Sequence, residues 1–251
     1  MNSKELLIFD IKGEYGHFRK YNTTTSPLTY SIPTRTAIVG MLGAIIGMER
    51  EVSDGVYQEG VIPVQEFFSK KDCDIAVQIM KPIKKVNIGF NLINTKTSFY
   101  NLTRAGRTQI EFELVKDVHY RIFLTMANEV FFRELSNLIK NKHHYFTPYL
   151  GLAQFTAEID YIQLTRANEV FSSGAYTEII TAVNISKLHG EAPVEFQREF
   201  VYSANNMPIT MDRYRNVLEY SEVLIEKSGN SLKVNVPAFY EVDKVGNILF
   251  L

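Results

Sequence analysis

The chain has a single cysteine, Cys73, and no apolar run long enough to cross a bilayer. One thiol excludes an internal disulfide. The least polar stretch, Ala37 to Met48, is twelve residues long and would span about 18 Å as a helix, against a hydrocarbon core of about 30 Å. At the amino terminus an apolar run is cut short by Asp10, which is typical of a strand and not of a signal peptide. We therefore expect a cytoplasmic protein that does not insert into a membrane.

Metal-ligand patterns are also missing. The five histidines give no spaced pair of the zinc type, and the rings of two adjacent ones point to different sides; they are His17, His119, His143, His144 and His189. We predict neither a bound metal nor a cofactor.

Acidic residues are missing from one segment. Between Ile75 and Ile110 there is no Asp or Glu, but six basic residues: Lys81, Lys84, Lys85, Lys96, Arg104 and Arg107. The rest of the chain holds 21 basic and 28 acidic residues, so its formal charge is −7, although the whole chain carries only −1. This asymmetry favours a polyanion-binding face. The alternative is a strand edge kept soluble by lysine.

The glycine-rich stretch "YSIPTRTAIVGMLGAIIGM", residues 30–48, predicts a buried helix that begins near Pro33. Its three glycines are Gly40, Gly43 and Gly47. They are not a phosphate-binding loop, because no Gly-Lys-Ser/Thr follows. Their spacing places them on one helical face, so we expect them to let the helix lie close to the sheet.

The apolar pattern of residues 1–164 predicts an α+β domain. Strands are expected over 4–11, 74–80, 86–92 and 156–164, with a hairpin of 109–115 and 118–125 around Lys116-Asp117. A second helix is expected over 127–141, with Asn128 as its N-cap and an apolar stripe of Val130, Phe131, Leu135, Leu138 and Ile139. The order strand, helix, strand, strand, helix, strand is that of the ferredoxin-like βαββαβ unit.

Residues 165–251 predict a smaller β-rich lobe that packs on this domain, because no low-complexity linker separates the two. Val194, Phe196, Phe200 and Tyr202 are expected on one face of a strand, and a hairpin is expected from 217–226 and 232–240.

Two clusters could carry chemistry. A long loop is expected over 12–27, and its "GHFRKY" interleaves aromatic and basic residues, as in proteins that stack bases and pair phosphates of single-stranded RNA; these are His17, Phe18, Arg19, Lys20 and Tyr21. At least one of the aromatics Phe18 and Tyr21 is expected to fold onto the core. Thr34 and Arg35 would add an anion site at the start of the helix.

The second cluster, Lys142, His143, His144 and Tyr145, has the groups that acid–base RNA cleavage without metal requires. Lysine and histidine are equally typical of a solvated helix end. A third hypothesis makes the chain an interaction module with no RNA contact.

Several motifs together resemble a known family. These are "FDIKGEYGHFRK", then Tyr30-Ser31-Ile32-Pro33, "TRTAIVGMLGAIIG", and later "YFTPYLGLAQF". They are similar to the fifth Cas protein family, the RAMP-fold subunit of type I CRISPR Cascade complexes, with the I-B branch as the nearest. The match runs over residues 9–47 and 145–155, and the carboxy-terminal lobe matches only in length and β content.

This resemblance implies a non-enzymatic subunit that caps the 5′ handle of crRNA, contacts the Cascade backbone subunit, and lies beside the large subunit near the PAM of the target DNA. It implies that RNA is bound by the loop after the first strand, by the start of the first helix, by a projecting thumb within residues 81–107, and by the "PYLG" loop. The residues so implied are His17, Phe18, Arg19, Lys20, Tyr21, Thr34, Arg35, Lys96, Arg104, Arg107, Pro148, Tyr149 and Gly151. One branch of the family cuts pre-crRNA with Tyr, Lys and His, so cleavage remains the alternative.

Overall fold

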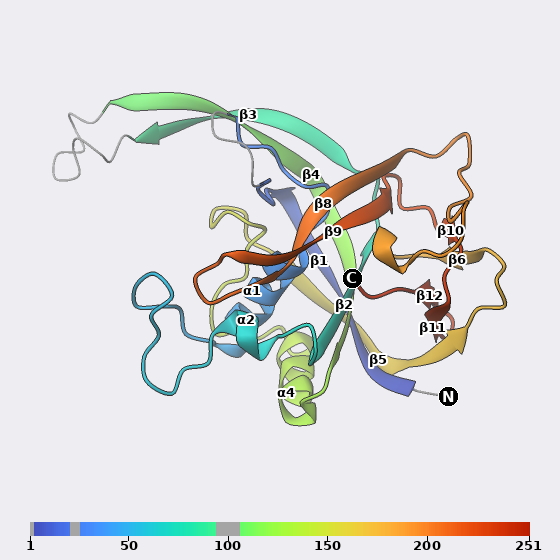
Figure 1. The fold of residues 1–251 in the computed structure, drawn as a ribbon. Helices are drawn as coiled ribbons and strands as arrows, with labels where there is room; N and C mark the ends of the chain where they lie inside the picture. Colours follow the sequence, from blue (N-terminus) through green and yellow to red (C-terminus); the bar gives the residue numbers. More distant parts are fainter. Residues whose placement is uncertain (1–2, 21–25, 94–105) are drawn as a thin grey trace.

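The computed structural model describes residues 3–20, 26–93 and 106–251. It is an α+β fold of mostly antiparallel strands with few helices (Figure 1). In chain order the elements are β1 (Ser3–Gly16), α1 (Arg35–Ile46), α2 (Val64–Phe67), β2 (Cys73–Ile79), β3 (Lys84–Ile93), β4 (Arg107–Met126), α4 (Glu129–Lys140), β5 (Glu158–Phe171), β6 (Thr177–Ile179), β7 (Val183–Asn184), the 3₁₀ turn η1 (Ile185–Lys187), β8 (Tyr202–Met211), β9 (Val217–Glu226), β10 (Leu232–Val234), β11 (Ala238–Val242) and β12 (Gly246–Ile248). None of the described helices is long and apolar enough to span a membrane.

The main sheet has the strand order β12-β11-β5-β1-β4-β2, and β3 pairs with β4 beyond this row. Strand β1 is central because it pairs with both β4 and β5. Its residues alternate between two cores: Leu7 and Phe9 join the core under α1 and α4, whereas Leu6 and Ile8 join a smaller core on the opposite face. Both faces of this strand are therefore covered, which explains why six consecutive residues, 6–11, are buried.

The first predicted helix, α1, begins after Thr34, whose hydroxyl accepts a hydrogen bond from the Ala37 N–H at 3.1 Å. The expectation that its three glycines face the sheet is wrong. Gly40 is exposed, and Gly43 lies against Val64 of α2. Gly47 ends the helix with φ of +78°, a backbone conformation that glycine adopts without steric cost.

The second predicted helix, α4, is confirmed with Asn128 as its N-cap, but its buried stripe differs by one position. Phe132, Leu135 and Ile139 are buried, while Val130 is 75% exposed. The sheet on which the helix packs decides which side of the helix is buried. Because Phe131 and Phe132 are both apolar, the sequence pattern alone could not tell which of them faces the sheet.

The predicted hairpin around Lys116-Asp117 is wrong, because β4 is one continuous strand of 20 residues. Asp117 has φ of +54° and lies where the outer partner of β4 changes. Residues 120–126 pair with β2, and residues 107–116 pair with β3. The predicted loop over 12–27 is also shorter than expected, since β1 continues to Gly16 beside β4.

The carboxy-terminal residues form two small sheets, β7-β9-β8 and β10-β6, and also contribute strands to the main sheet. The expected division at residue 164 falls inside β5, and β11 and β12 extend the main sheet at its β5 edge. The predicted hairpin of 217–226 with 232–240 is wrong, because β9 pairs with β8 and β10 pairs with β6. The predicted strand through Phe196 is replaced by an isolated bridge at Val194, and β8 begins at Tyr202.

Candidate nucleic-acid interface

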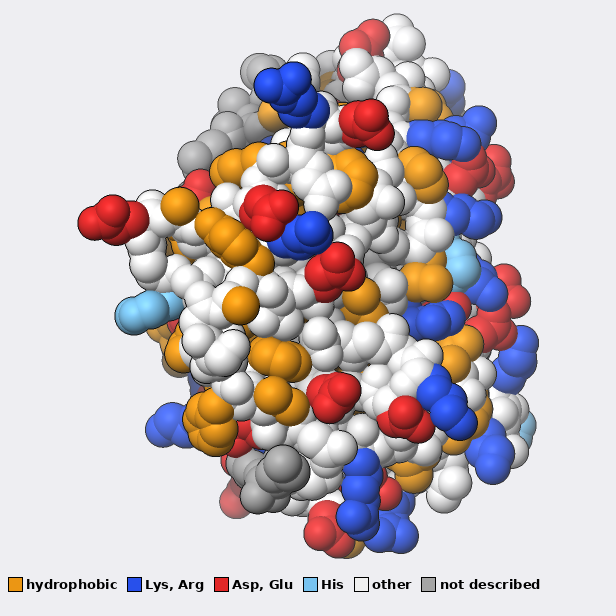
Figure 2. Space-filling model, turned by 90° about the vertical axis from the view of Figure 1, so that its right-hand side faces the viewer, with side chains coloured by type: hydrophobic (Ala, Val, Ile, Leu, Met, Phe, Trp, Pro, Cys, Tyr) orange, Lys and Arg blue, Asp and Glu red, His pale blue; other side chains and the backbone are white. Residues whose placement is uncertain are grey.

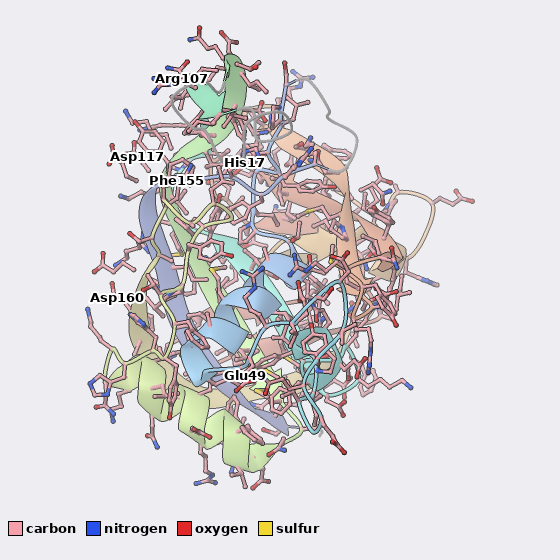
Figure 3. All side chains as sticks on the ribbon, turned by 90° about the vertical axis from the view of Figure 1, so that its left-hand side faces the viewer. His17, Glu49, Arg107, Asp117, Phe155 and Asp160 are labelled. Carbon is pink, nitrogen blue, oxygen red and sulfur yellow. The ribbon has the colours of Figure 1, made fainter. Side chains whose placement is uncertain are left out.

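The segment that follows β1 folds back on itself beside the base of the β3–β4 hairpin. The Lys20 N–H donates to the Leu28 carbonyl, and the Tyr30 N–H donates to the Phe18 carbonyl, both at 2.8 Å. Residues 17–20 and 28–30 are thus held as a short antiparallel pair, which we call the β1 flap. Figure 3 shows His17 near the base of the hairpin, whose outer end carries Arg107.

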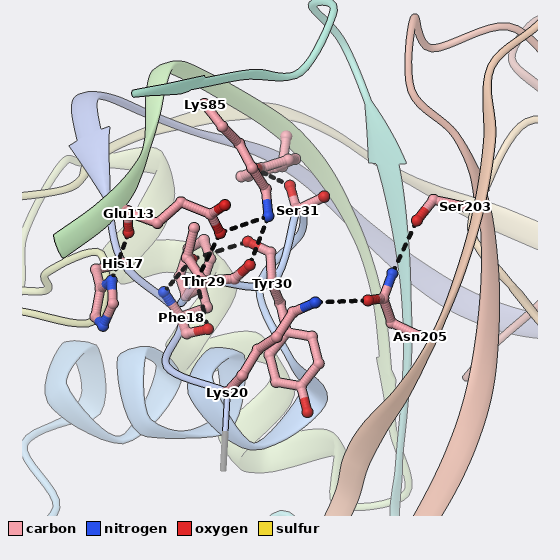
Figure 4. Close-up of polar contacts among 11 residues, drawn as sticks. His17, Phe18, Lys20, Thr29, Tyr30, Ser31, Lys85, Glu113, Ser203 and Asn205 are labelled. Carbon is pink, nitrogen blue, oxygen red and sulfur yellow. Dashed lines mark hydrogen bonds and ion pairs between the residues drawn. The ribbon is translucent and has the colours of Figure 1, made fainter. Parts of the chain in front are cut away.

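Glu113 of β4 connects the β1 flap to the hairpin (Figure 4). Its Oε1 accepts from the Thr29 N–H at 3.0 Å and from Lys85 Nζ at 2.8 Å. Lys85 Nζ also donates to the Thr29 carbonyl at 2.7 Å. Burial raises the pKa of Glu113, but these two donors outweigh it and hold the pKa below its ordinary value. The carboxylate is therefore charged at neutral pH and fixes the flap to β3 and β4.

His17, which was expected among the RNA-binding residues of the loop, is buried. Its Nδ1–H donates to the Glu113 carbonyl at 2.9 Å, and its Nε2 has no partner among the described residues. Burial lowers the pKa of its imidazole, with Arg19 adding to the effect. The ring packs 5.3 Å from Phe112, which makes His17 part of the support of the flap.

Of the other flap residues, Phe18 folds onto the core, as expected of at least one aromatic there, and packs edge-on against Tyr120. Arg19 is exposed. Lys20 is half-buried, with Nζ 2.8 Å from Asn205 Oδ1 of β8 and 5.5 Å from the centre of the Tyr30 ring. Tyr21 lies outside the described residues.

Arg35 is the clearest departure from the predicted site. Only 3% of the residue is exposed, and its Nη2 donates to the carbonyls of Phe68 at 3.0 Å and Cys73 at 2.7 Å. Burial lowers the pKa of its guanidinium. The guanidinium therefore does not lie at the surface, as an anion site at the start of the helix would need; it ties the helix to the chain between α2 and β2. Thr34 is also buried and serves as the N-cap.

The "PYLG" loop docks against the β1 flap. The His17 N–H donates to the Leu150 carbonyl at 2.9 Å, and Leu150 is buried. Gly151 has φ of +87°, and a Cβ there would overlap the His17 carbonyl. Pro148 is buried, whereas Tyr149 is 42% exposed. The loop therefore presents the Tyr149 side chain, while its glycine allows close contact between two backbones.

The acid-free segment contains β3 and the first residues of β4, and the β3–β4 hairpin extends beyond the main sheet (Figure 1). β3 and β4 pair continuously from Lys84–Lys116 to Ile93–Arg107. Arg107 is exposed, and Lys96 and Arg104 lie outside the described residues. Farther along the hairpin, the Phe90 ring lies with its centre 4.9 Å from that of Phe112 and 6.4 Å from that of Phe155.

The cluster proposed for catalysis is only partly assembled. Lys142 Nζ forms an ion pair with Asp160 at 2.7 Å, which raises the pKa of the lysine. Lys142, His143 and His144 line one cavity of about 170 Å³ with Ile45 and Glu158. The Tyr145 ring instead covers Gly47. Among the described residues no group of His, Cys, Asp or Glu is arranged to hold a metal.

Two polar residues of the site were not singled out from the sequence: Glu113 and Asn205. Glu113 lies just outside the acid-free segment, and only the pairing of β3 with β4 brings it to Lys85. Asn205 belongs to the carboxy-terminal residues, where the sequence showed no local charge pattern. Figure 2 shows a face of the molecule on which basic, acidic and hydrophobic side chains are mixed, so the described residues of this face form no large patch of one charge.

The fold is similar to that of chains in solved structures of CRISPR complexes. A chain titled "CRISPR RNA-guided surveillance complex" superposes with a TM-score of 0.54 at 11% identity and covers 91% of both chains. A chain from a type III-B Cmr-beta structure bound to cognate target RNA and AMPPnP gives a TM-score of 0.52 at 12% identity, and covers 90% of this chain and 86% of its own. No curated protein matches the sequence.

The fold is thus that of CRISPR-associated proteins. The family model described as CRISPR-associated protein (Cas_Cas5) matches residues 6–223. The chain belongs to this family.

Proposed function

We propose that the protein is a non-catalytic subunit of a type I CRISPR Cascade complex, of the I-B branch, that binds and caps the 5′ handle of crRNA. One observation carries this proposal: Glu113 and Lys85 join the β1 flap, with exposed Arg19, to the base of the basic β3–β4 hairpin. RNA that follows the hairpin toward its base would meet the flap and Tyr149 of the "PYLG" loop. Such a surface offers cations for phosphates and an aromatic ring for a base.

The topology supports a ferredoxin-like RAMP domain as the core of this subunit. The strands β5-β1-β4-β2 are adjacent in that order, with α1 following β1 and α4 following β4. The β3–β4 hairpin would then be the thumb. Family membership and the two similar structures support association with the backbone and large Cascade subunits, near the PAM of target DNA, in the cytoplasm.

Binding of handle RNA to the purified protein tests the proposal. We expect Arg19→Ala and Arg107→Ala each to weaken binding roughly fivefold at 0.1 M salt and to reduce the slope of log K against log salt by about 0.7, the value for one phosphate of single-stranded RNA. The control is Arg133→Ala, which removes an exposed arginine from α4. Equal affinity and slope in all four proteins would contradict the proposal, and no binding at all would favour an interaction module.

Cleavage of pre-crRNA is the second candidate, and the cavity shared by Lys142, His143 and His144 favours it. The protein is incubated with a repeat-containing transcript in EDTA. Cleavage that is lost in His143→Ala or His144→Ala would establish the enzyme, and an intact transcript would exclude it.

A further inference from the structure

Two lysines from distant parts of the sequence lie beside residues 29–30, and the backbone of a third lies next to the start of β3. Lys20 comes from the β1 flap, Lys85 from β3, and Lys227 from the turn after β9. Lys20 Nζ lies 5.5 Å from the centre of the Tyr30 ring, and Lys85 Nζ donates to the Thr29 carbonyl next to it. Figure 4 shows Lys20 and Lys85 both reaching the 29–31 segment.

Lys227 is held near this group by its backbone. Its carbonyl accepts from the Ile83 N–H at 2.8 Å, two residues before Lys85, and its N–H donates to the Val201 carbonyl at 2.8 Å. The following turn is fixed on the end of β2, because a Cβ at Gly229 would lie 2.6 Å from the Ile79 carbonyl oxygen. The position of Lys227 relative to β3 is therefore set by the fold of the carboxy-terminal residues.

Two carboxylates lie next to these lysines. Glu113 pairs with Lys85, and the carboxylate of Glu226, beside Lys227, is used by the N–H groups of Val201, Ser228 and Asn230. In the described part of the chain Lys227 forms no ion pair. Burial lowers the pKa of Lys20, and the charges of Lys85 and Lys227 lower it further, while Glu113 opposes them. An anion placed here would relieve this repulsion.

We propose that Lys20, Lys85 and Lys227 form a subsite for one backbone phosphate of single-stranded RNA, formed jointly by the β1 flap, the β3–β4 hairpin and the β9–β10 turn. Asn205 orients Lys20, because its Oδ1 accepts from Nζ while its Nδ2 donates to Ser203 Oγ at 3.0 Å. The inference rests on the proposed RNA-binding function and extends it to residues beyond β5, which were not in the predicted site.

The test uses the full chain and an unstructured octauridylate oligonucleotide, with binding followed by fluorescence anisotropy over a range of salt concentrations. We expect Lys227→Gln and Lys20→Gln each to weaken binding roughly fivefold and to reduce the salt slope by about 0.7. The fold-loss of RNA affinity in the double variant should be smaller than the product of the two single losses, because both lysines contact the same phosphate. The matched control is Lys71→Gln, an exposed lysine before β2.

The outcomes separate this inference from the proposed function. If the wild type binds the oligonucleotide and Lys227→Gln binds with unchanged affinity and slope, the subsite is overturned and RNA binding stands. If Arg19→Ala loses binding but Lys20→Gln does not, the phosphate lies elsewhere on the flap, which also overturns the subsite. A wild type that binds no RNA overturns both. Thermal unfolding of each variant shows that the substitutions act on a folded protein.

Discussion

Some polar residues of this chain are exposed and able to contact a ligand, whereas others are buried and hold the backbone in place. The residue type alone does not tell the two groups apart. Arg19 and Arg35 were both expected at phosphates, yet Arg19 is exposed, whereas Arg35 is buried on the carbonyls of Phe68 and Cys73. We expect Arg35→Ala to lower the free energy of unfolding by about 2–4 kcal/mol, because buried carbonyls left without donors cost about 1–3 kcal/mol each.

Urea unfolding measures that loss, and RNA affinity per folded molecule should be unchanged. Arg19→Ala is the matched variant: its stability should stay within about 0.5 kcal/mol of wild type, as for most surface substitutions, while its affinity falls. A stable Arg35→Ala protein that fails to bind RNA would show that the arginine contacts RNA after all.

Gly151 gives a second prediction for a single residue. It combines φ of +87° with contact against the His17 carbonyl, whereas Gly174 has φ of +90° and open space beyond its Cα. Gly174→Ala should therefore lower the free energy of unfolding only by the cost of a left-handed backbone conformation for alanine, about 1–2 kcal/mol. Gly151→Ala should cost at least about 2 kcal/mol more, because the overlapping atoms are backbone and cannot move aside. Equal losses in urea unfolding would contradict the close packing of the "PYLG" loop on the flap.

At the scale of elements, the junction between the β1 flap and the β3–β4 hairpin depends on one carboxylate. The folded-state pKa of Glu113 lies below its ordinary value, which is about 4.3–4.5 in an unfolded chain. Its contribution to stability is thus complete above that value and is lost as pH falls through the lower folded-state pKa. Glu113→Gln should flatten the stability profile between about pH 5 and pH 3, as measured by urea unfolding at each pH. The difference from wild type isolates Glu113, since all other carboxylates are common to both proteins; parallel profiles would contradict the role of this carboxylate.

How far the elements could be predicted depends on the range of the interactions that define them. Strands β2 and β3 were predicted from the alternation of apolar and polar residues, and helix α4 from its N-cap and its 3.6-residue apolar period. Both signals come from residues that are close together in the sequence. The strands that pair with β4 and β9 were not predicted correctly. Lys116-Asp117 and Ser228-Gly229-Asn230 have turn-forming sequences, but such a sequence does not show whether the strands on its two sides pair with each other. The basic residues of the hairpin could be found because they are close together in the sequence. The burial of His17 and Arg35 could not be predicted, because it depends on carbonyls from distant parts of the chain.

At the scale of the whole molecule, the residues after β5 complete the structure of those before it. Met207, Ile209, Val223, Ile225 and Leu251 join the same core as α1 and α4. The Leu251 N–H donates to the Ile75 carbonyl at 2.9 Å. Parts of a chain that share a core are expected to unfold together.

We therefore expect the full chain to unfold in a single urea transition that coincides when followed by far-ultraviolet circular dichroism and by tyrosine fluorescence. A fragment of residues 1–164 should not fold, because it ends inside β5 and lacks β8, which packs against α1, and the apolar side chains that β9 adds to the same core. A fragment of residues 1–171, which keeps all of β5, is the control for strand truncation and should fail as well. Two separate transitions, or a cooperative melt of either fragment, would show instead that the carboxy-terminal residues form an independent lobe and that Lys227 is not fixed relative to β3.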